Sequence, residues 1–240
     1  MVMFMNSLIR TQIALPNGNK RDFFHRNSTA DLGVLHQIFS QQDYSIEKLR
    51  RSQELFDIFG TIIRSGASPL IIDAGANIGA SALWFSIAFP RSQIVCFEPD
   101  PANFKLLEMN TLGLNVELYQ AAIGATDGLV DLIDPGEGEW GYQTKPNPLG
   151  ATERVSLSRI VKTKKKSGFE PFIAKIDIEG GEADLFSSRT GWVSEFPLII
   201  IELHDWLLPK KRTSANFIKT IGDLNRDFIY FGENIFSIKN

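Results

Sequence analysis

Two short polar segments carry side chains that could remove a proton from a substrate. Asp177-Ile178-Glu179 ends the strand expected over Phe172 to Asp177, and Glu202-Leu203-His204-Asp205 follows the strand expected over Pro197 to Ile201. In a doubly wound parallel sheet the ligand lies across the carboxyl ends of the strands, so both segments are expected to face one crevice. His204 is our first candidate for a general base, because the reference pKa of imidazole is about 6.5. Asp177 is the second candidate, and Asp177 or Glu202 could orient the imidazole.

A strand, a glycine turn and a helix precede these segments and form the expected cofactor site. Leu70-Ile71-Ile72 is a buried-strand signal, Asp73 to Gly79 form a tight turn, and Ala80 to Phe89 read as a helix. The next apolar run, Ile94 to Phe97, ends at Glu98, so the segment is expected to be one βαβ unit. The glycines would let a ligand approach the backbone, and the carboxylate of Glu98 could accept both hydroxyls of a ribose.

The spacing of the glycines separates two kinds of cofactor. A dinucleotide site needs G-x-G-x-x-G to seat a pyrophosphate on the helix N-terminus, whereas this turn reads G-A-N-I-G. The charge of Asp73 would oppose a pyrophosphate and suit a cation. S-adenosylmethionine carries a sulfonium and an ammonium and has no phosphate. We therefore expect that cofactor, and a nucleotide-dependent oxidoreductase is the weaker alternative.

Four blocks of the sequence, in order, resemble the signature blocks of the FkbM-type methyltransferases. They are Asp73-Ala74-Gly75-Ala76-Asn77-Ile78-Gly79, Phe97 to Phe104, Ala121 to Gly124, and Lys175 to Glu182. The resemblance implies a class I methyltransferase fold: an α/β, Rossmann-like, doubly wound and mostly parallel seven-stranded sheet. It also implies S-adenosylmethionine as donor, S-adenosylhomocysteine as product, and usually a hydroxyl oxygen as acceptor. Gly181 stands where the family more often has alanine.

Together, the βαβ signal and the resemblance define a set of expected cofactor-binding residues. These are Asp73, Gly75, Ala76, Asn77, Gly79, Glu98, Pro99, Asn103, Ala122, Asp177 and Glu179. The assignment of Ala122 to the adenine rests mainly on the resemblance, since small residues there are equally what a tight strand exit needs. The resemblance supports Asp177 and Glu179 as site residues without separating their roles.

Two regions are expected to surround the acceptor. Residues 1–66 read as an N-terminal hairpin and helical extension, with helices from Asp31 through Phe39 and from Ile46 to Arg64, ahead of a methyltransferase domain over 67–240. The extension either lids the site or covers a sheet edge. Residues 130–155 read as a long irregular loop. Its Trp140 and Tyr142 are expected to contact the acceptor, together with Glu179 and His204.

Composition sets the broad class of the protein. The chain has 240 residues, 43% hydrophobic and 22% charged, which is ordinary for a globular domain. Its net charge of -3 argues against a nucleic-acid partner. The single cysteine, Cys96, lies in an apolar strand, which favours a buried thiol and a cytoplasmic protein, and we expect no signal peptide or membrane span. The sequence does not indicate an oligomeric state.

These features predict an S-adenosylmethionine-dependent O-methyltransferase that acts on a sugar, glycan, polyketide or other secondary-metabolite hydroxyl. Metal-free catalysis by His204, Asp177 and Glu202 is favoured, and Mg²⁺ held by the same three residues is the alternative. Glu182 belongs either to this set or to the first turn of the following helix. A non-catalytic cofactor-binding or scaffold protein is the rival from another class. A DNA amino methyltransferase is remote, because Asp-Ile-Glu-Gly stands where Asn or Asp-Pro-Pro-aromatic would be needed.

Overall fold

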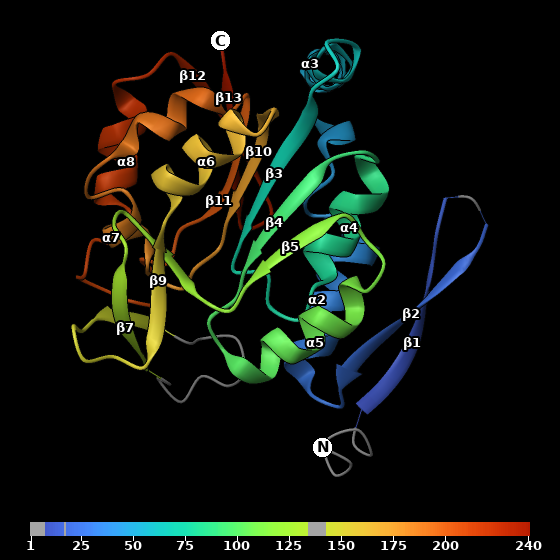
Figure 1. The fold of residues 1–240 in the computed structure, drawn as a ribbon, viewed down its shortest axis with the longest axis horizontal. Helices are drawn as coiled ribbons and strands as arrows, with labels where there is room; N and C mark the ends of the chain where they lie inside the picture. Colours follow the sequence, from blue (N-terminus) through green and yellow to red (C-terminus); the bar gives the residue numbers. More distant parts are fainter. Residues whose placement is uncertain (1–7, 17, 134–142) are drawn as a thin grey trace.

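A central sheet of seven strands organises the molecule (Figure 1). The structure is a computed structural model, and it describes residues 8–16, 18–133 and 143–240. The strand order is β12-β13-β11-β10-β3-β4-β5. The strands span Ser68–Ala74 (β3), Gln93–Phe97 (β4), Val116–Tyr119 (β5), Phe169–Ile176 (β10), Leu198–Glu202 (β11), Arg226–Phe231 (β12) and Asn234–Lys239 (β13). Strands β11, β10, β3, β4 and β5 run parallel, and the β12–β13 hairpin adds an antiparallel edge, which agrees with the predicted mostly parallel sheet.

Helices cover both faces of this sheet, as the apolar strand sequences require. Figure 1 shows α4 and α5 on one side and α6 and α8 on the other. The helices are α2 (Thr29–Leu35), α3 (Ser52–Arg64), α4 (Ala80–Ala88), α5 (Pro101–Thr111), α6 (Leu157–Lys166), α7 (Glu182–Leu185) and α8 (Ala215–Gly222). Successive residues of β3 enter opposite cores: Ile71 packs in the cluster that contains Phe85 of α4, and Ile72 packs in the one that contains Phe217 of α8.

The N-terminal extension forms the predicted hairpin and joins the α4 side of the core. Strands β1 (Leu8–Ala14) and β2 (Lys20–Arg26) pair antiparallel, and their tip closes through the Leu15 N–H to the carbonyl of Asn19 at 2.8 Å. The side chain of Asn110 in α5 binds both the N–H and the carbonyl of Phe24, at 2.7 and 2.8 Å. Phe23 and Tyr44 are buried in the same cluster as α4. The extension therefore shares its core with the rest of the chain.

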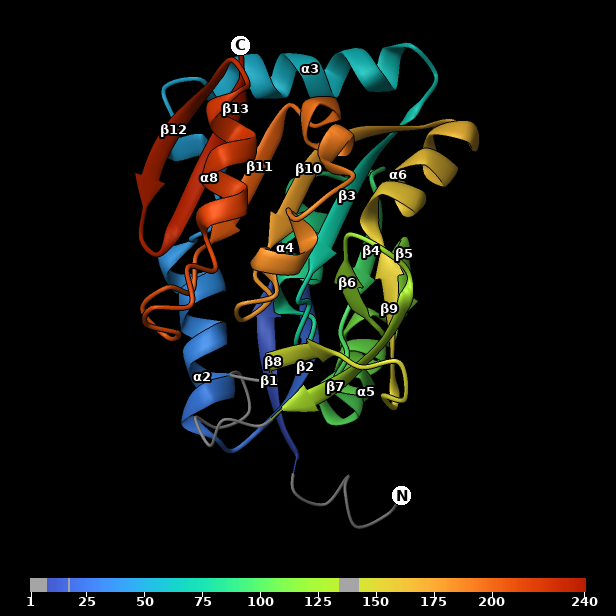
Figure 2. The same ribbon diagram turned by 90° about the vertical axis from the view of Figure 1, so that its left-hand side faces the viewer.

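Two predictions about the helices of the extension were wrong. Ser28, not Asp31, caps α2, because its hydroxyl accepts the Asp31 N–H at 3.2 Å, while the Asp31 carboxylate pairs with Arg26 at 2.7 Å. The chain stays helical past Phe39, but over His36–Gln41 it is a π-helix and not an α-helix. The helix expected over 46–64 is broken: a 3₁₀ turn covers Ile46–Lys48, and α3, which lies across the top of the sheet in Figure 2, begins only at Ser52.

A second sheet replaces much of the loop predicted over 130–155. Its strands are β6 (Ala122–Gly124), β7 (Gly128–Ile133), β8 (Gln143–Pro146) and β9 (Thr152–Ser156), in the order β6-β9-β7-β8. In β7, β8 and β9 only scattered residues such as Val130 and Val155 are buried, so the apolar alternation that marks a strand is too weak there to detect in the sequence. The Gly150 backbone also lies so close to Val130 that a Cβ would be 2.4 Å from its carbonyl oxygen. Pairing between backbones, and not an apolar sequence pattern, therefore determines the strands of the second sheet.

One further helical segment completes the fold. A 3₁₀ helix over Thr190–Glu195 lies between α7 and β11. No helix in residues 8–16, 18–133 and 143–240 has both the length and the apolar character needed to cross a bilayer.

Candidate active site

The glycine turn after β3 locks three strand ends together. Gly75 has a φ of +79°, and a Cβ on it would lie 1.7 Å from the backbone oxygen of Asp177 at the end of β10. The N–H groups of Gly75 and Ala76 both donate to the carbonyl of Phe97 at the end of β4, at 3.0 Å. Asn77 continues the turn in the left-handed region, with a φ of +48°. The turn therefore fixes the position of β10 relative to β4.

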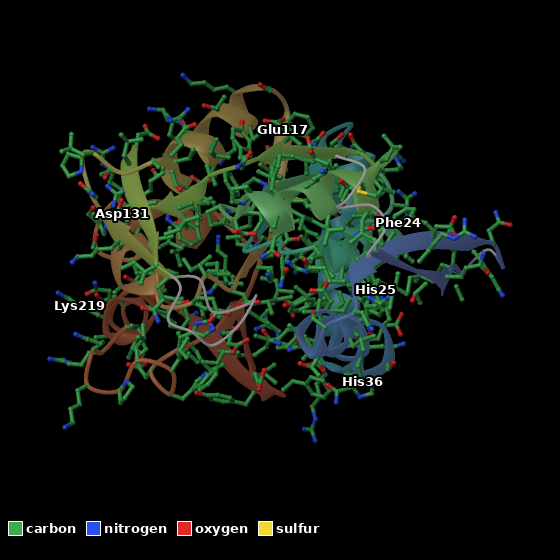
Figure 3. All side chains as sticks on the ribbon, turned by 90° about the horizontal axis from the view of Figure 1, so that it is seen from below. Phe24, His25, His36, Glu117, Asp131 and Lys219 are labelled. Atoms are coloured by element: carbon green, nitrogen blue, oxygen red, sulfur yellow. The ribbon has the colours of Figure 1, made fainter. Side chains whose placement is uncertain are left out.

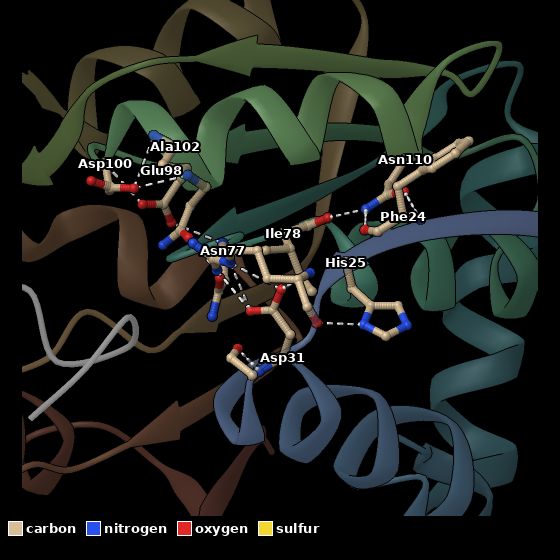
Figure 4. Close-up of polar contacts among 12 residues, drawn as sticks. Phe24, His25, Asp31, Asn77, Ile78, Glu98, Asp100, Ala102 and Asn110 are labelled. Atoms are coloured by element: carbon tan, nitrogen blue, oxygen red, sulfur yellow. Dashed lines mark hydrogen bonds and ion pairs between the residues drawn. The ribbon is translucent and has the colours of Figure 1, made fainter. Parts of the chain in front are cut away.

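Glu98 closes the turn from the next strand (Figure 4). One carboxylate oxygen accepts the N–H of Asn77 at 2.8 Å and the other accepts the N–H of Asp100 at 2.9 Å. Burial raises the pKa of Glu98 to about 7, although both backbone N–H groups act in the opposite direction. A carboxylate has about four lone-pair sites, so two remain for hydroxyl donors. Asp100 also caps α5, and Pro101 is its first residue.

Binding of S-adenosylhomocysteine is expected to depend on pH through Glu98. Only the ionised carboxylate can accept two hydroxyl donors, so affinity should rise from pH 6 to pH 8, by about tenfold for a pKa near 7. The neighbouring charges of Asp100 and Lys175 act on this pKa in opposite directions. Isothermal titration at several pH values measures the effect. Glu98→Gln should bind weakly with little pH dependence, and an equal slope in both proteins would contradict the assignment.

The two predicted polar segments meet around His204. Its side chain is fully buried, and its Nδ1 is 2.8 Å from Oε1 of Glu182, which is the first residue of α7 and equally buried. Its Nε2 faces three carboxylates: Glu179 and Glu202 at 3.4 Å and Asp177 at 3.6 Å. The fourth carboxylate of the cluster is thus Glu182. The nearby Asp205 carboxylate instead accepts the N–H of Ser214, at 3.3 Å.

The shared negative charge of this cluster changes its protonation. Burial by itself would lower the pKa of His204, but the carboxylates around it, Glu182 and Glu202 first among them, raise it to about 11. Burial and the charge of Asp177 raise the pKa of Glu179 to about 8. The cluster therefore stabilises a positive charge among its carboxylates. At neutral pH the protonated imidazole of His204 supplies this charge.

Lys175 lies beneath the turn and was missed by the sequence analysis. Its ammonium donates to the carbonyl of Gly75 at 2.6 Å and lies 3.4 Å from both Asp73 and Asp177, with its side chain only 2% exposed. Asp73 is its register partner on β3 and also accepts the hydroxyl of Ser81 at 2.6 Å. A lysine inside an apolar strand was the available signal, because lysine is almost never fully buried unless it is paired.

A pocket opens between Glu98 and the cluster. Among the described residues it is lined by Gly75, Asn77, Phe97, Glu98, Pro99, Asn103, Ala121, Ala122, Ile123, Thr144, Asp177, Ile178 and Glu179. All the predicted cofactor residues are in this set except Asp73, Ala76 and Gly79. Asp73 supports Lys175, Ala76 is 1% exposed, and Gly79 begins α4 against Leu107. The second sheet contributes Ala122 and Ile123 from β6 and Thr144 from β8.

The predicted acceptor residues have different outcomes. Trp140 and Tyr142 lie outside the described residues, so nothing is concluded about them. Trp206 was missed: it is 69% exposed, and its ring lies 6.3 Å from that of His204. Its position two residues after His204 was the only sequence signal. His25 and His36, which the sequence left unassigned, lie on the N-terminal elements (Figure 3), and His25 binds Thr11 across the hairpin at 2.9 Å.

Comparison with known proteins finds similar methyltransferases. The sequence model of the methyltransferase FkbM domain family matches residues 73–230 of this chain. Hexuronic acid methyltransferase AglP of Haloferax volcanii is 24% identical over 200 residues, which is 78% of each protein. The 2-O-methyltransferase NoeI of Sinorhizobium fredii is 26% identical over 156 residues, covering 57% of this chain and 64% of NoeI.

A solved structure, magnesium protoporphyrin IX methyltransferase ChlM from Synechocystis PCC 6803 with bound SAM, aligns with a TM-score of 0.39 and 12% identity over 89% of this chain and 93% of ChlM. The family match covers well over half of the chain. The chain belongs to the FkbM methyltransferase family and is an S-adenosylmethionine-dependent methyltransferase.

Proposed function

We propose that this methyltransferase acts on a hydroxyl group of a sugar, either in a glycan or on a glycosylated metabolite. Two observations support this acceptor class. The relatives include a hexuronic acid methyltransferase and a 2-O-methyltransferase. The exposed ring of Trp206, beside the His204 cluster, offers an apolar face against which the C–H face of a sugar can pack.

The residues of the pocket fit the donor. Glu98 has free lone pairs for the ribose hydroxyls, and Ala122 and Ile123 leave an apolar wall for the adenine. Asp177 and Glu179 bring negative charge to the other end, which suits the positive sulfonium and ammonium. The buried Asp73 acts on the donor only through the turn that it and Lys175 support.

The chemistry requires two reactants in line and the removal of one proton. When bound, S-adenosylmethionine supplies a methyl group on a positive sulfur; the O–CH₃ bond forms as the S–CH₃ bond breaks. In this proposal the hydroxyl proton goes to the cluster of Asp177, Glu202 and His204, where a carboxylate accepts it because the imidazole is already protonated at neutral pH. Asp177 makes the direct contact, because its side chain is 26% exposed and lines the pocket, whereas His204 is fully buried behind it.

One observation carries the proposal: Asp177 and Glu179 belong both to the donor pocket and to the His204 cluster. A carboxylate that can accept a proton would thereby lie beside a methyl donor bound in this pocket. The arrangement also favours a hydroxyl over a carboxylate acceptor, because a carboxylate has no proton to lose and would be repelled by the negative charge of the cluster.

The test is incubation with methyl-labelled S-adenosylmethionine and a panel of glycosides, uronic-acid glycans and lipid-linked sugars. We expect alkali-stable label, as in a methyl ether, and about 10²–10⁴-fold slower turnover in Asp177→Asn with S-adenosylhomocysteine still bound. Label released as methanol by mild alkali would reveal an ester and contradict the hydroxyl acceptor. Full activity of Asp177→Asn would show that this cluster does not accept the hydroxyl proton.

A further inference from the structure

One ring nitrogen of His204 points into a gap between carboxylates. The side chain is fully buried, and Nε2 makes no hydrogen bond to any of the described residues. It nevertheless has oxygens of Glu179 and Glu202 at 3.4 Å and of Asp177 at 3.6 Å. Burying a polar atom without a hydrogen bond costs free energy. We therefore expect a positively charged group between Nε2 and the three carboxylates.

Glu182 determines which atom of the imidazole faces that gap. A carboxylate accepts hydrogen bonds, so the 2.8 Å contact means that Nδ1–H of His204 donates to Glu182. In the neutral imidazole the lone pair is then on Nε2, directed at the three carboxylates. Metal-binding histidines are commonly held in this way, with the second nitrogen donating to a carboxylate.

We propose that Asp177, Glu179 and His204 bind one first-row divalent cation, represented here by Mn²⁺. Each residue offers one ligand atom, and these atoms all lie within 4.8 Å of one another. Ligands about 2.1 Å from one ion, at angles of 90–110°, are about 3.0–3.4 Å apart. The contacts of Nε2 with Glu179 at 3.4 Å and with Asp177 at 3.6 Å need little closure, and the widest pair of ligand atoms, within 4.8 Å, must close by at most about 1.4 Å. Asp177 and Glu179 line the pocket, which leaves the remaining coordination positions open to a substrate oxygen.

The mixed ligand set favours Mn²⁺ over Mg²⁺. Carboxylates suit both ions, but Mg²⁺ prefers oxygen ligands and imidazole nitrogen binds first-row transition ions more strongly. The cation site itself is independent of the acceptor. Its use rests on the proposed function: a cation here would bind the acceptor oxygen and make its hydroxyl more acidic. Asp177 would then be a ligand of the ion, so the hydroxyl proton would leave to Glu202 instead, the remaining carboxylate beside His204.

Mn²⁺ binding can be measured without any acceptor. The chain is freed of metal with EDTA and titrated with Mn²⁺ or Mg²⁺ by calorimetry, with free Mn²⁺ also followed by electron paramagnetic resonance. We expect one Mn²⁺ per chain, at least tenfold tighter than Mg²⁺. Glu179→Gln and His204→Gln should weaken Mn²⁺ binding at least tenfold, and Glu182→Gln should weaken it by about 10–100-fold as the supporting carboxylate.

Asp205→Asn is the matched control, because this neighbouring carboxylate binds a backbone N–H outside the cluster. It should leave Mn²⁺ affinity unchanged. Melting temperature and circular dichroism establish that each variant is folded, and Glu179→Gln, with a partly exposed side chain, serves if the buried His204 variant does not fold.

Absence of Mn²⁺ binding would overturn the proposal and leave a protonated imidazole as the positive charge of the cluster. Unchanged affinity in Glu179→Gln would also overturn it, and equal Mg²⁺ affinity would overturn the role of the imidazole. S-adenosylhomocysteine binding and methyl transfer without Mn²⁺ binding would reject the cation site alone. Mn²⁺ binding without methylation of any sugar would reject the proposed acceptor and keep the site.

Discussion

Replacing Gly75 with alanine is expected to reduce the affinity for S-adenosylhomocysteine by at least about 100-fold. The added Cβ would lie 1.7 Å from the backbone oxygen of Asp177, so the turn and the end of β10 must separate. Displacements of about 1 Å in a binding constellation are known to cost this much. Valine should be worse, since its branched side chain is also strained at a φ of +79°. Calorimetric titration with S-adenosylhomocysteine measures the loss.

Gly113→Ala is the matched control for this effect. Gly113 has the same φ of +79°, but no heavy atom lies within 4 Å of the point that an added Cβ would occupy. It should lose only about 1–2 kcal/mol of unfolding free energy through backbone strain and keep its cofactor affinity. Equal cofactor affinities in the two alanine variants would mean that the contact between Gly75 and Asp177 does not control the pocket.

Lys175→Met is expected to lower the free energy of unfolding by about 3–5 kcal/mol, because it leaves two carboxylates without their buried partner. Burial by itself would lower the pKa of Lys175, but the charges around it, Asp177 and Asp73 among them, hold that pKa above its usual value. The ammonium is therefore charged in the folded protein. In a chain of this size the loss corresponds to a melting temperature lower by about 6–20 °C. Urea denaturation followed by circular dichroism measures it.

Lys165→Met provides the comparison on the surface. Lys165 pairs with Glu195 with both side chains more than one third exposed, so this change should cost less than about 1 kcal/mol. A second test adds Asp73→Asn to Lys175→Met, which removes one of the two unpaired charges and should regain part of the loss. Similar costs for both lysine variants, or no recovery in the double variant, would show that Lys175 is not the counter-ion of the turn.

Local sequence was sufficient wherever a strong pattern acts over a few residues. The apolar runs before Asp73, Glu98 and Asp177 became β3, β4 and β10, and Asp100-Pro101 began α5, because burial on both faces and helix capping leave little choice. Patterns with weak burial failed. The strands of the second sheet were missed. Asp31 was expected to cap a helix, but its carboxylate forms an ion pair with Arg26.

The choice between metal-free catalysis and a bound cation also depends on contacts that the sequence does not show. The sequence indicated only that Asp177, Glu202 and His204 lie near one another. It showed no contact that distinguishes a general base from a cation-binding site. The structure adds the buried Glu182 on Nδ1 and the free Nε2. The contact between Glu182 and His204 joins α7 to the segment after β11, and together with the unbonded Nε2 it is the reason for the Mn²⁺ proposal.

The sequence by itself determined the βαβ unit, the donor turn with Glu98, and the family blocks, since these depend on residue types at fixed short spacings. Tertiary structure alone decided that Lys175 supports the turn, that Glu182 orients His204, and that Trp206 is the exposed ring beside the cluster. Each of these contacts joins residues from different elements or depends on where a loop packs. Their geometry follows from strand register and helix packing, which no local spacing encodes.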